Sequence, residues 1–212
     1  MSVPEGVTVV DHVLLRRLLS ILRDRETPHG LFRQTLDDAG MILAYEAMRA
    51  LRPVDTEVQT PLEPAAGVRL ADQVVIVAIL RAGLGLVDGF LRLVPDARVG
   101  HLGMYRDEEA LRPVGYYENI PSGVARAEVF VLDPMLATGG SSKQAIARLK
   151  RADAQRITFV CLVAAPEGVQ ALRSAHPDVP ILTAALDRQL DDNGYIRPGL
   201  GDAGDRIFGT DR

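Results

Sequence analysis

The stretch that decides the fold runs from residue 128 to residue 146 and reads EVFVLDPMLATGGSSKQAI. Residues 128–132 are mostly apolar, which is typical of a short strand buried on both faces of a parallel sheet. The strand ends at Asp133, and a turn with two adjacent glycines leads into a helical pattern over 141–151. A buried strand, a glycine-rich turn and a helix in succession indicate part of a βαβ unit.

The same alternation of strands and helices continues on both sides of this unit. Residues 84–94 and 167–175 have helical patterns, and short apolar runs predict further strands at 74–80, 98–105, 114–118, 157–164 and 181–186. The polar segment DEEALRP (107–113) joins two of these strands and predicts a protruding β-hairpin over 100–118. Strands that alternate with helices predict an α/β fold with a doubly wound, mostly parallel sheet.

The two ends of the chain have a different character. Residues 11–25 place leucines at spacings of three and four, and residues 31–51 continue a helical pattern that Pro53 ends. The C-terminal segment is rich in glycine, which predicts loops. We therefore expect a single domain over 1–212, divided into an N-terminal helical arm (1–60), an α/β core (61–186) and a loop-rich C-terminal hood (187–212).

The composition is that of a globular protein without a general affinity for polyanions. Of its 212 residues 47% are hydrophobic and 25% are charged, and the formal net charge is −4. This charge argues against a broad nucleic-acid-binding surface, which needs a basic face. The sequence contains no run of about 18 apolar residues, which a membrane span would need. The N-terminus lacks the pattern of a signal peptide. The single cysteine, Cys161, lies in an apolar run, so we expect a buried thiol in a cytoplasmic protein.

The turn after Asp133 has the chemistry of a site for a sugar phosphate. Its glycines let backbone N–H groups approach a ligand closely, and the N-terminus of the following helix adds partial positive charge. Thr138, Ser141 and Ser142 add hydroxyl donors. Asp133 would repel a phosphate, but its carboxylate suits ribose hydroxyls or a metal ion. The alternative is a glycine-rich start of a helix without a ligand; the P-loop motif and the G-x-G-x-x-G motif are both absent.

Three arginines lie near the same edge of the predicted sheet. Arg81 follows the strand 74–80 directly, and Arg106 lies near the tip of the predicted hairpin, with Arg112 close by. Ligands of such sheets bind at the carboxyl ends of the strands, where arginines could hold a pyrophosphate and a mobile hairpin could exclude water. The alternatives are a solvated arginine and a charged surface hairpin. The histidines show no metal-ligand spacing.

The segment VFVLDPMLATGGSS (129–142) resembles the phosphoribosyl-pyrophosphate-binding motif of type I phosphoribosyltransferases, in the form of their uracil-specific branch. Six other segments resemble that branch in the same order: LAYEAMR (43–49), AILRAGLGLVDG (78–89), GMYRDEEALRPVGYY (103–117), VAAPEG (163–168), HPDV (176–179) and GYIRPGLGDAGDRIFGT (194–210). The wider family has two adjacent acids in its motif. Here Pro134 replaces the second, which leaves Asp133 as the acid expected on the ribose hydroxyls.

The resemblance implies a reaction and a set of roles. Uracil and phosphoribosyl pyrophosphate (PRPP) would give UMP and diphosphate, with Arg106, Asp133 and Asp202 as catalytic residues. The implied PRPP-binding residues are Arg81, Arg106, Asp133, Pro134, Met135, Leu136, Ala137, Thr138, Gly139, Gly140, Ser141 and Asp202. The implied uracil-binding residues are Ile196, Gly201, Asp202 and Ala203, all in the hood.

The resemblance also implies a cofactor and partners. Mg²⁺ would be bound mainly through PRPP and diphosphate, with no direct protein ligand. A homo-oligomer, dimeric or tetrameric, and activation by GTP are expected on the same ground, whereas no nucleic-acid or membrane partner is expected.

Three other functions remain open from the sequence. The same fold could transfer the ribosyl group to adenine, guanine, hypoxanthine or orotate, and only the resemblance of the hood favours uracil. A regulator that binds RNA would need a basic face, which the net charge of −4 disfavours. A ligand-binding protein without catalysis would lack a site residue, and none is missing from the motifs.

Overall fold

The computed structural model describes residues 3–106 and 113–210, and only the backbone of 105–106 and 113–114. Its centre is a sheet in the order β1 (Val7–Val9), β10 (Ile181–Leu186), β9 (Arg156–Ala164), β7 (Glu128–Leu132), β4 (Val74–Leu80), β5 (Arg98–Arg106) and β6 (Pro113–Asn119). The two-residue strand β8 (Met135–Leu136) also pairs with β9. Neighbouring strands are parallel apart from β5 and β6, which form the predicted antiparallel hairpin; its tip lies outside the described residues.

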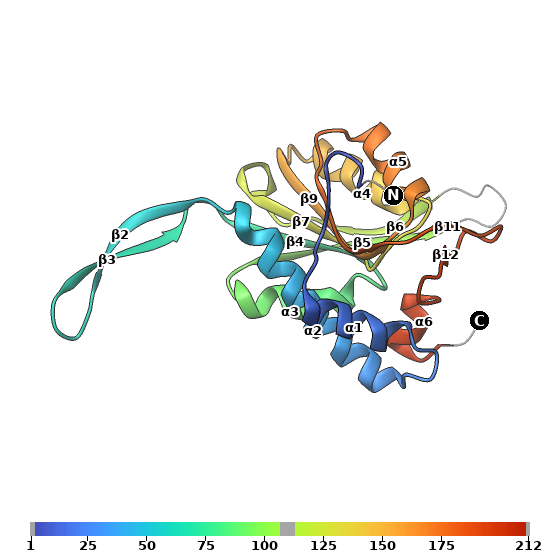
Figure 1. Cartoon of the computed structure of the whole chain (residues 1–212). Coiled ribbons are helices and arrows are strands. Elements are labelled where there is room, and N and C mark those ends of the chain that lie inside the picture. The colour runs from blue at the N-terminus through green and yellow to red at the C-terminus, as the bar shows by residue number, and fades with distance from the viewer. Residues whose placement is uncertain (1–2, 107–112, 211–212) are drawn as a thin grey trace.

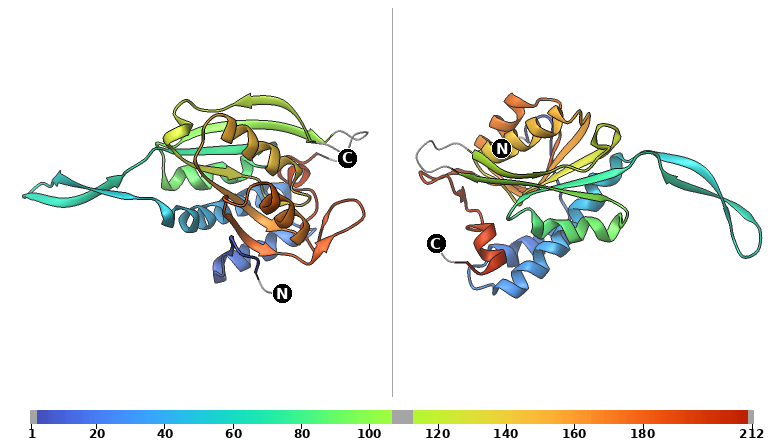
Figure 2. Two further views of the ribbon diagram at one scale, coloured as in Figure 1. Left: turned by 90° about the horizontal axis from the view of Figure 1, so that it is seen from above. Right: turned by 180° about the vertical axis from the view of Figure 1, so that it is seen from behind.

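Helices cover both faces of the sheet, as Figure 1 and Figure 2 show. One face carries α1 (Val13–Arg23), α2 (His29–Ala47), α3 (Leu84–Leu93) and the short C-terminal α6 (Ala203–Phe208). The other carries α4 (Gly140–Arg151) and α5 (Pro166–Ala175). Short 3-10 helices occupy Met48–Ala50 and Val124–Arg126. This arrangement confirms the predicted α/β fold with a doubly wound, mostly parallel sheet.

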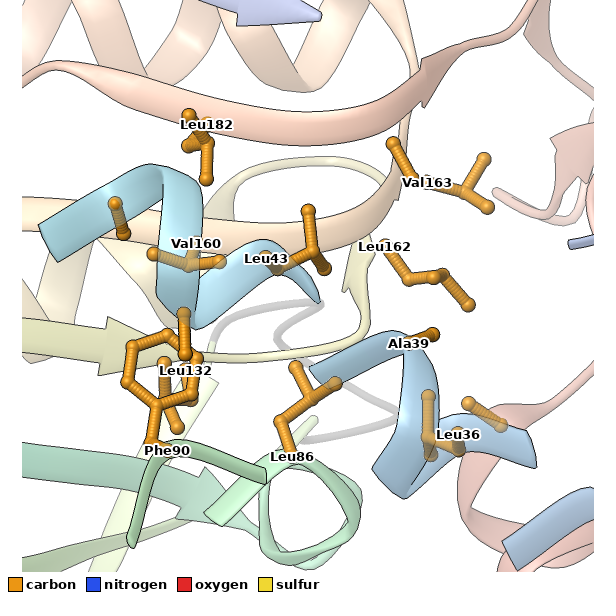
Figure 3. Packing of buried hydrophobic residues seen from close by; sticks show 14 of the residues in the cluster. Leu36, Ala39, Leu43, Leu86, Phe90, Leu132, Val160, Leu162, Val163 and Leu182 are labelled. Carbon is orange, nitrogen blue, oxygen red and sulfur yellow. The ribbon is translucent and has the colours of Figure 1, made fainter. Parts of the chain in front are cut away.

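Strand β7 directs apolar side chains to both faces of the sheet because both faces are buried. Phe130 and Leu132 of β7 point into the core under α2 and α3, where Phe130 packs against Phe90 with ring centroids 5.7 Å apart. Val129 and Val131 point into the second core, under α4 and α5. Figure 3 shows the first core, with Leu132, Leu86 and Phe90 packed against α2. Burial on both faces removes the alternation of polar and apolar residues that a half-exposed strand would show.

The predicted N-terminal helical arm over 1–60 is correct for its two helices and wrong for the strands that flank them. The helices α1 and α2 are present and pack on the sheet through buried residues that include Leu15, Leu22, Phe32 and Leu43. Before them, residues 7–9 form an edge strand that pairs with β10. In α1 the face that buries consists of Leu15, Leu19 and Leu22, whereas Leu14 is exposed.

An extended hairpin crosses the predicted boundary between residues 60 and 61. Strands β2 (Pro53–Gln59) and β3 (Pro64–Leu70) pair antiparallel in a sheet of their own and project from the body (Figure 1, Figure 2). Residues 53–60 are therefore not helical, and 61–70 are not part of the core. Since neither face of this hairpin packs on the core, its sequence carries no buried apolar run.

The chain order of the strands creates a crevice between β4 and β7. From β4 the chain moves to β5 and β6 on one side, and it returns to β7, β9 and β10 on the other. Ligands of open α/β sheets bind where the strand order reverses in this way, at the carboxyl ends of the strands. Arg81 follows β4 and Asp133 follows β7 at this point. The predicted hood, which contains β11 (Gln189–Leu190), β12 (Ile196–Arg197) and α6, covers the same edge.

Candidate active site

A cavity of about 370 Å³ lies between the Asp133 turn and the hood. Its lining includes seven residues to which the sequence assigned a role: Asp133, Met135, Ala137, Ile196, Gly201, Asp202 and Ala203. Five lining residues were missed: Ala82, Asn193, Gly194, Tyr195 and Gly204. Ala82, Tyr195 and Gly204 are next to predicted residues, and they and Gly194 lie in quoted motifs, whereas Asn193 precedes the last of those motifs. The structure therefore brings the predicted donor loop and the predicted base-binding loop to one cavity.

Backbone hydrogen bonds to β9 hold the Asp133 turn in place. The carbonyl of Pro134 accepts from the N–H groups of Leu162 and Val163, each at 3.0 Å. The carbonyl of Leu136 accepts from Ala165 N–H at 2.9 Å. Because Pro134 and Leu136 are buried, their side chains belong to the core. Of this stretch, Met135 and Ala137 are the residues that reach the cavity.

Two glycines allow the end of the turn to approach α5 closely. Gly139 has φ 77° and is the residue before α4; a Cβ there would lie 2.9 Å from the carbonyl oxygen of Gly168. A Cβ on Gly168 would lie 2.3 Å from the carbonyl oxygen of Ala137. Neither position tolerates a larger residue without moving backbone. This contact explains the glycine of the VAAPEG segment, which the sequence alone did not.

The hydroxyl groups of the turn differ in their surroundings. Thr138 is exposed and Ser141 is partly exposed at the start of α4. Ser142 is buried, and its hydroxyl donates to the carbonyl of Gly139 at 3.0 Å. The prediction that Ser142 donates to a ligand is therefore wrong, because its hydroxyl closes the first turn of α4 instead. The backbone N–H groups of that turn, at the positive end of the helix, are placed to favour an anion.

Asp133 is partly buried and lines the cavity. Its carboxylate accepts from Met135 N–H at 3.4 Å, a long contact that compensates little for lost hydration. Burial, with a smaller contribution from the nearby charge of Asp202, raises the pKa of Asp133 from 3.8 to about 7. The carboxylate is thus close to its protonation equilibrium near neutral pH. A neighbouring cation or hydroxyl donors from a ligand would stabilise its charged form.

Asp202 begins the short helix α6. Its side chain accepts from Asp205 N–H at 3.0 Å, which makes it the N-cap of the helix. The residue before it, Gly201, has φ 81°, a conformation that other residues rarely adopt. Together they turn the chain so that Gly201, Asp202 and Ala203 face the cavity. The second carboxylate oxygen of Asp202 accepts no hydrogen bond within the described part of the chain.

Of the three predicted arginines, the structure describes only the side chain of Arg81, and it does not line the cavity. Arg81 has a half-exposed side chain that lies along α6, with Nη2 3.6 Å from Asp205 Oδ1 and the guanidinium 5.6 Å from the ring of Phe208. Its neighbour Ala82 lines the cavity in its place. For Arg106 only the backbone, at the end of β5, is described, and Arg112 lies outside the described residues. The assigned roles of these arginines stay predictions.

The remaining titratable candidates offer no separate chemistry. Burial raises the pKa of the Cys161 thiol to about 12, so the thiol remains protonated inside β9, in agreement with the predicted buried cysteine. Among residues 3–106 and 113–210, no cluster of three or more His, Cys, Asp or Glu side chains could hold a metal ion. Over the same ranges, no helix is long and apolar enough to cross a membrane.

Comparison with known proteins agrees with the motifs. The sequence model of the family described as "Uracil phosphoribosyltransferase" matches residues 9–210. A protein of that name from Salinibacter ruber is 66% identical over 206 residues, with 97% of this chain and 98% of the relative covered. The protein of that name from Lactococcus lactis subsp. cremoris MG1363 is 55% identical, with 95% and 97% covered.

Solved structures agree with the fold. The AQ2163 protein from Aquifex aeolicus superposes with a TM-score of 0.92 at 36% identity, covering 96% of this chain and 98% of that one. An adenine phosphoribosyl transferase from Trypanosoma brucei, at 12% identity, shares the fold with a TM-score of 0.61. On the family match and the identities over nearly the full length, this chain belongs to the uracil phosphoribosyltransferase family.

Proposed function

We propose that this chain transfers the 5-phosphoribosyl group of PRPP to uracil, giving UMP and diphosphate in pyrimidine salvage. The observation that carries the proposal is the shared cavity. The donor motif around Asp133 and the glycine-rich hood around Asp202 are far apart in sequence but line one space of about 370 Å³. That size fits one small planar base next to a sugar.

In the proposed reaction, N1 of uracil forms a bond to the anomeric carbon of the ribose. The bond from that carbon to the diphosphate oxygen breaks, and the N1 proton is released. Positive charge grows on the ribose and negative charge on the leaving diphosphate, so the protein acts mainly by positioning and by electrostatic stabilisation. The start of α4 is suited to the 5-phosphate, and Asp133, beside it, to the ribose hydroxyls.

The hood is suited to reading the edge of the base. Uracil presents an imide with a fixed order of carbonyl and N–H groups, which backbone N–H and C=O groups can match. Ile196, Gly201 and Ala203 offer such groups at the cavity. A base with the wrong order, such as cytosine, would leave a buried group unpaired, which costs about 1–3 kcal/mol.

We further propose Mg²⁺ as the cofactor. Two carboxylates, Asp133 and Asp202, face the cavity, and no third carboxylate lines it within the described chain, which fits an ion held largely by the oxygens of its substrate. Bound in this way, Mg²⁺ would neutralise charge on the diphosphate. Arg106, at the end of β5, would supplement it when the hairpin closes. Loss of activity with EDTA and its recovery with Mg²⁺ would support this assignment.

Assembly, regulation and location are proposed on weaker support. A homo-oligomer is favoured by the exposed apolar side chains of the β2–β3 hairpin, among them Leu62, which is 95% exposed. Activation by GTP rests on the family resemblance alone. A cytoplasmic location rests on the single buried cysteine. An RNA-binding role remains disfavoured by the net charge of −4.

The decisive experiment supplies the purified chain with PRPP, Mg²⁺ and labelled uracil, with and without GTP, and measures UMP by chromatography. Parallel reactions contain cytosine, orotate, adenine, hypoxanthine and guanine. Product from uracil alone is expected. Product from another base would preserve the donor site and contradict the assignment of the hood. No product with any base would leave a binding or regulatory protein.

A further inference from the structure

The base-binding loop needs support from outside itself. Between Ile196 and Ala203 the chain passes through Gly199 and Gly201, with φ of 61° and 81°. Glycine loses more conformational freedom on ordering than any other residue. A loop of this kind keeps a single shape only if other parts of the molecule hold its backbone.

An ion pair behind the loop supplies that support. Arg23, the last residue of α1, donates to both carboxylate oxygens of Asp187, which follows β10, at 2.8 and 2.6 Å. Asp187 also accepts from Gly199 N–H at 2.8 Å, and Arg23 also donates to the Gly199 carbonyl at 2.8 Å. The N–H and the C=O of one glycine are thus bonded to the two members of one ion pair. Asp187 is only 7% exposed, so these charge-assisted bonds are shielded from water.

The neighbouring peptide groups are held as well. A Cβ on Gly199 would lie 2.1 Å from the carbonyl oxygen of Ile196, so the turn is as tight as glycine allows. Arg206 donates to the carbonyl of Leu200 at 2.9 Å. The backbone from Ile196 to Leu200 is therefore fixed immediately before Gly201 enters the cavity. Neither Arg23 nor Asp187 lines the cavity itself.

We propose that Arg23 and Asp187 are positioning residues that set the register of the hood against the pyrimidine. The inference rests on the proposed function and deepens it, because it gives α1 a part in base recognition. The donor loop has a separate anchor, on β9 and α5, through Pro134 and Leu136. Loss of the ion pair should therefore weaken the use of uracil much more than the use of PRPP.

Steady-state kinetics on two variants test this. Arg23→Lys keeps the charge but cannot bond both oxygens of Asp187 and the Gly199 carbonyl together. The double variant Arg23→Met with Asp187→Leu replaces the buried pair by apolar groups, which often preserves stability, yet it leaves both backbone groups of Gly199 unpaired. In each we expect the KM for uracil to rise roughly 10-fold to 100-fold, as loss of buried charge-assisted bonds implies, while the KM for PRPP changes by less than about twofold.

The matched control is Arg156→Gln. Arg156 also bridges carboxylates, Glu128 at 2.5 Å and Asp72 at 3.1 Å, but at the opposite end of the sheet. The Arg156→Gln substitution should lower the Tm and leave the KM for uracil and the KM for PRPP unchanged. Folded Arg23 variants with an unchanged uracil KM, or with both KM values raised equally, would overturn the inference while UMP formation by the wild-type chain upheld the proposed function. A wild-type chain that forms no UMP would overturn both.

Discussion

At the scale of single residues, Asp133 makes a prediction about pH. Burial raises its pKa from 3.8 to about 7, so the folded chain holds this proton more tightly than the unfolded chain. The free energy of unfolding of the ligand-free protein should therefore fall as the pH rises from about 4 to about 7, with the full loss present above that range. Partial exposure to the cavity limits the loss to on the order of 1–3 kcal/mol.

The variant Asp133→Asn isolates this effect. The variant has no buried charge to form at high pH. The Tm of the variant minus the Tm of the wild-type chain should therefore be larger at about pH 8 than at about pH 5. UMP formation by the variant should fall. Thermal unfolding followed by circular dichroism at the two pH values measures the difference. Asp96→Asn, at an exposed carboxylate between α3 and β5, is the control. A constant Tm difference at both pH values would contradict the raised pKa.

Arg106 makes a prediction of the opposite kind, a large loss of activity without a loss of stability. In the proposed reaction it meets the negative charge that develops on diphosphate. One donor aimed at developing charge contributes about 2.7–4 kcal/mol to the transition state, so Arg106→Ala should lower kcat about 100-fold to 1000-fold. Its Tm should stay within about 1–2 °C of the wild-type value, because the role proposed for Arg106 lies in the reaction and not in the packing of the core. Unchanged turnover would exclude the hairpin from the reaction.

Which site residues could be predicted follows from how local their signals are. Asp133 and Gly139 stand in a short motif whose chemistry follows from its residues, whereas the role of Asp202 follows only from the resemblance to a family. The bond from Arg23 to Asp187 spans 164 positions and has no motif, because either residue alone reads as an ordinary helix-end cation or loop carboxylate. Ser142 was assigned to a ligand in error. A serine after a glycine-rich turn can donate to a ligand or to the first turn of a helix, and the sequence is the same in both cases.

At the scale of elements, the contact between the donor loop and α5 can be tested through Gly168. A Cβ at this position would meet two backbone oxygens, those of Ala137 at 2.3 Å and Leu136 at 2.6 Å. Backbone cannot yield as a flexible side chain can, so Gly168→Ala should displace α5 from the loop. We expect a loss of stability of about 1–3 kcal/mol and a raised KM for PRPP, measured by urea unfolding and by kinetics.

Gly30→Ala is the matched control for that substitution. Gly30 lies in the first turn of α2, and a Cβ there meets nothing within 4 Å. Alanine is the better helix former, so this variant should be neutral or more stable by up to about 1 kcal/mol, with unchanged kinetics. If Gly168→Ala behaved like Gly30→Ala, the close packing of α5 on the donor loop would be refuted.

Burial also decides which elements the sequence could predict. The strands β4, β7, β9 and β10 lie in the core, and their apolar runs are visible in the chain. The β2–β3 hairpin has no buried face, so Pro53 was read only as the end of a helix. The three residues of β1 are too few for a periodic signal, and they become a strand only by pairing with β10.

At the scale of the whole molecule, the β2–β3 hairpin forms a sheet of its own, and within the described residues neither strand pairs with a third. An isolated two-stranded hairpin is marginally stable in water, yet this one exposes Val58, Leu62 and Val68 by 44%, 95% and 69%. Burying such side chains against a second copy would gain about 25 cal/mol per Å² of apolar surface. The proposed homo-oligomer accounts for both the length and the apolar tip of the hairpin.

Shortening the hairpin tests this without disturbing the body. Its base is closed by the bond from Ala71 N–H to the Arg52 carbonyl at 2.9 Å and by the ion pair between Arg52 and Asp72 at 2.5 Å. Pro53 and Leu70 are paired, so an Asn-Gly turn can replace residues 54–69. Light scattering after size exclusion should show an assembly for the wild-type chain and a monomer for this variant, with similar circular dichroism. Leu62→Ser, which keeps the strands, should weaken assembly less; an unchanged mass in the shortened chain would place the contact between copies elsewhere on the molecule.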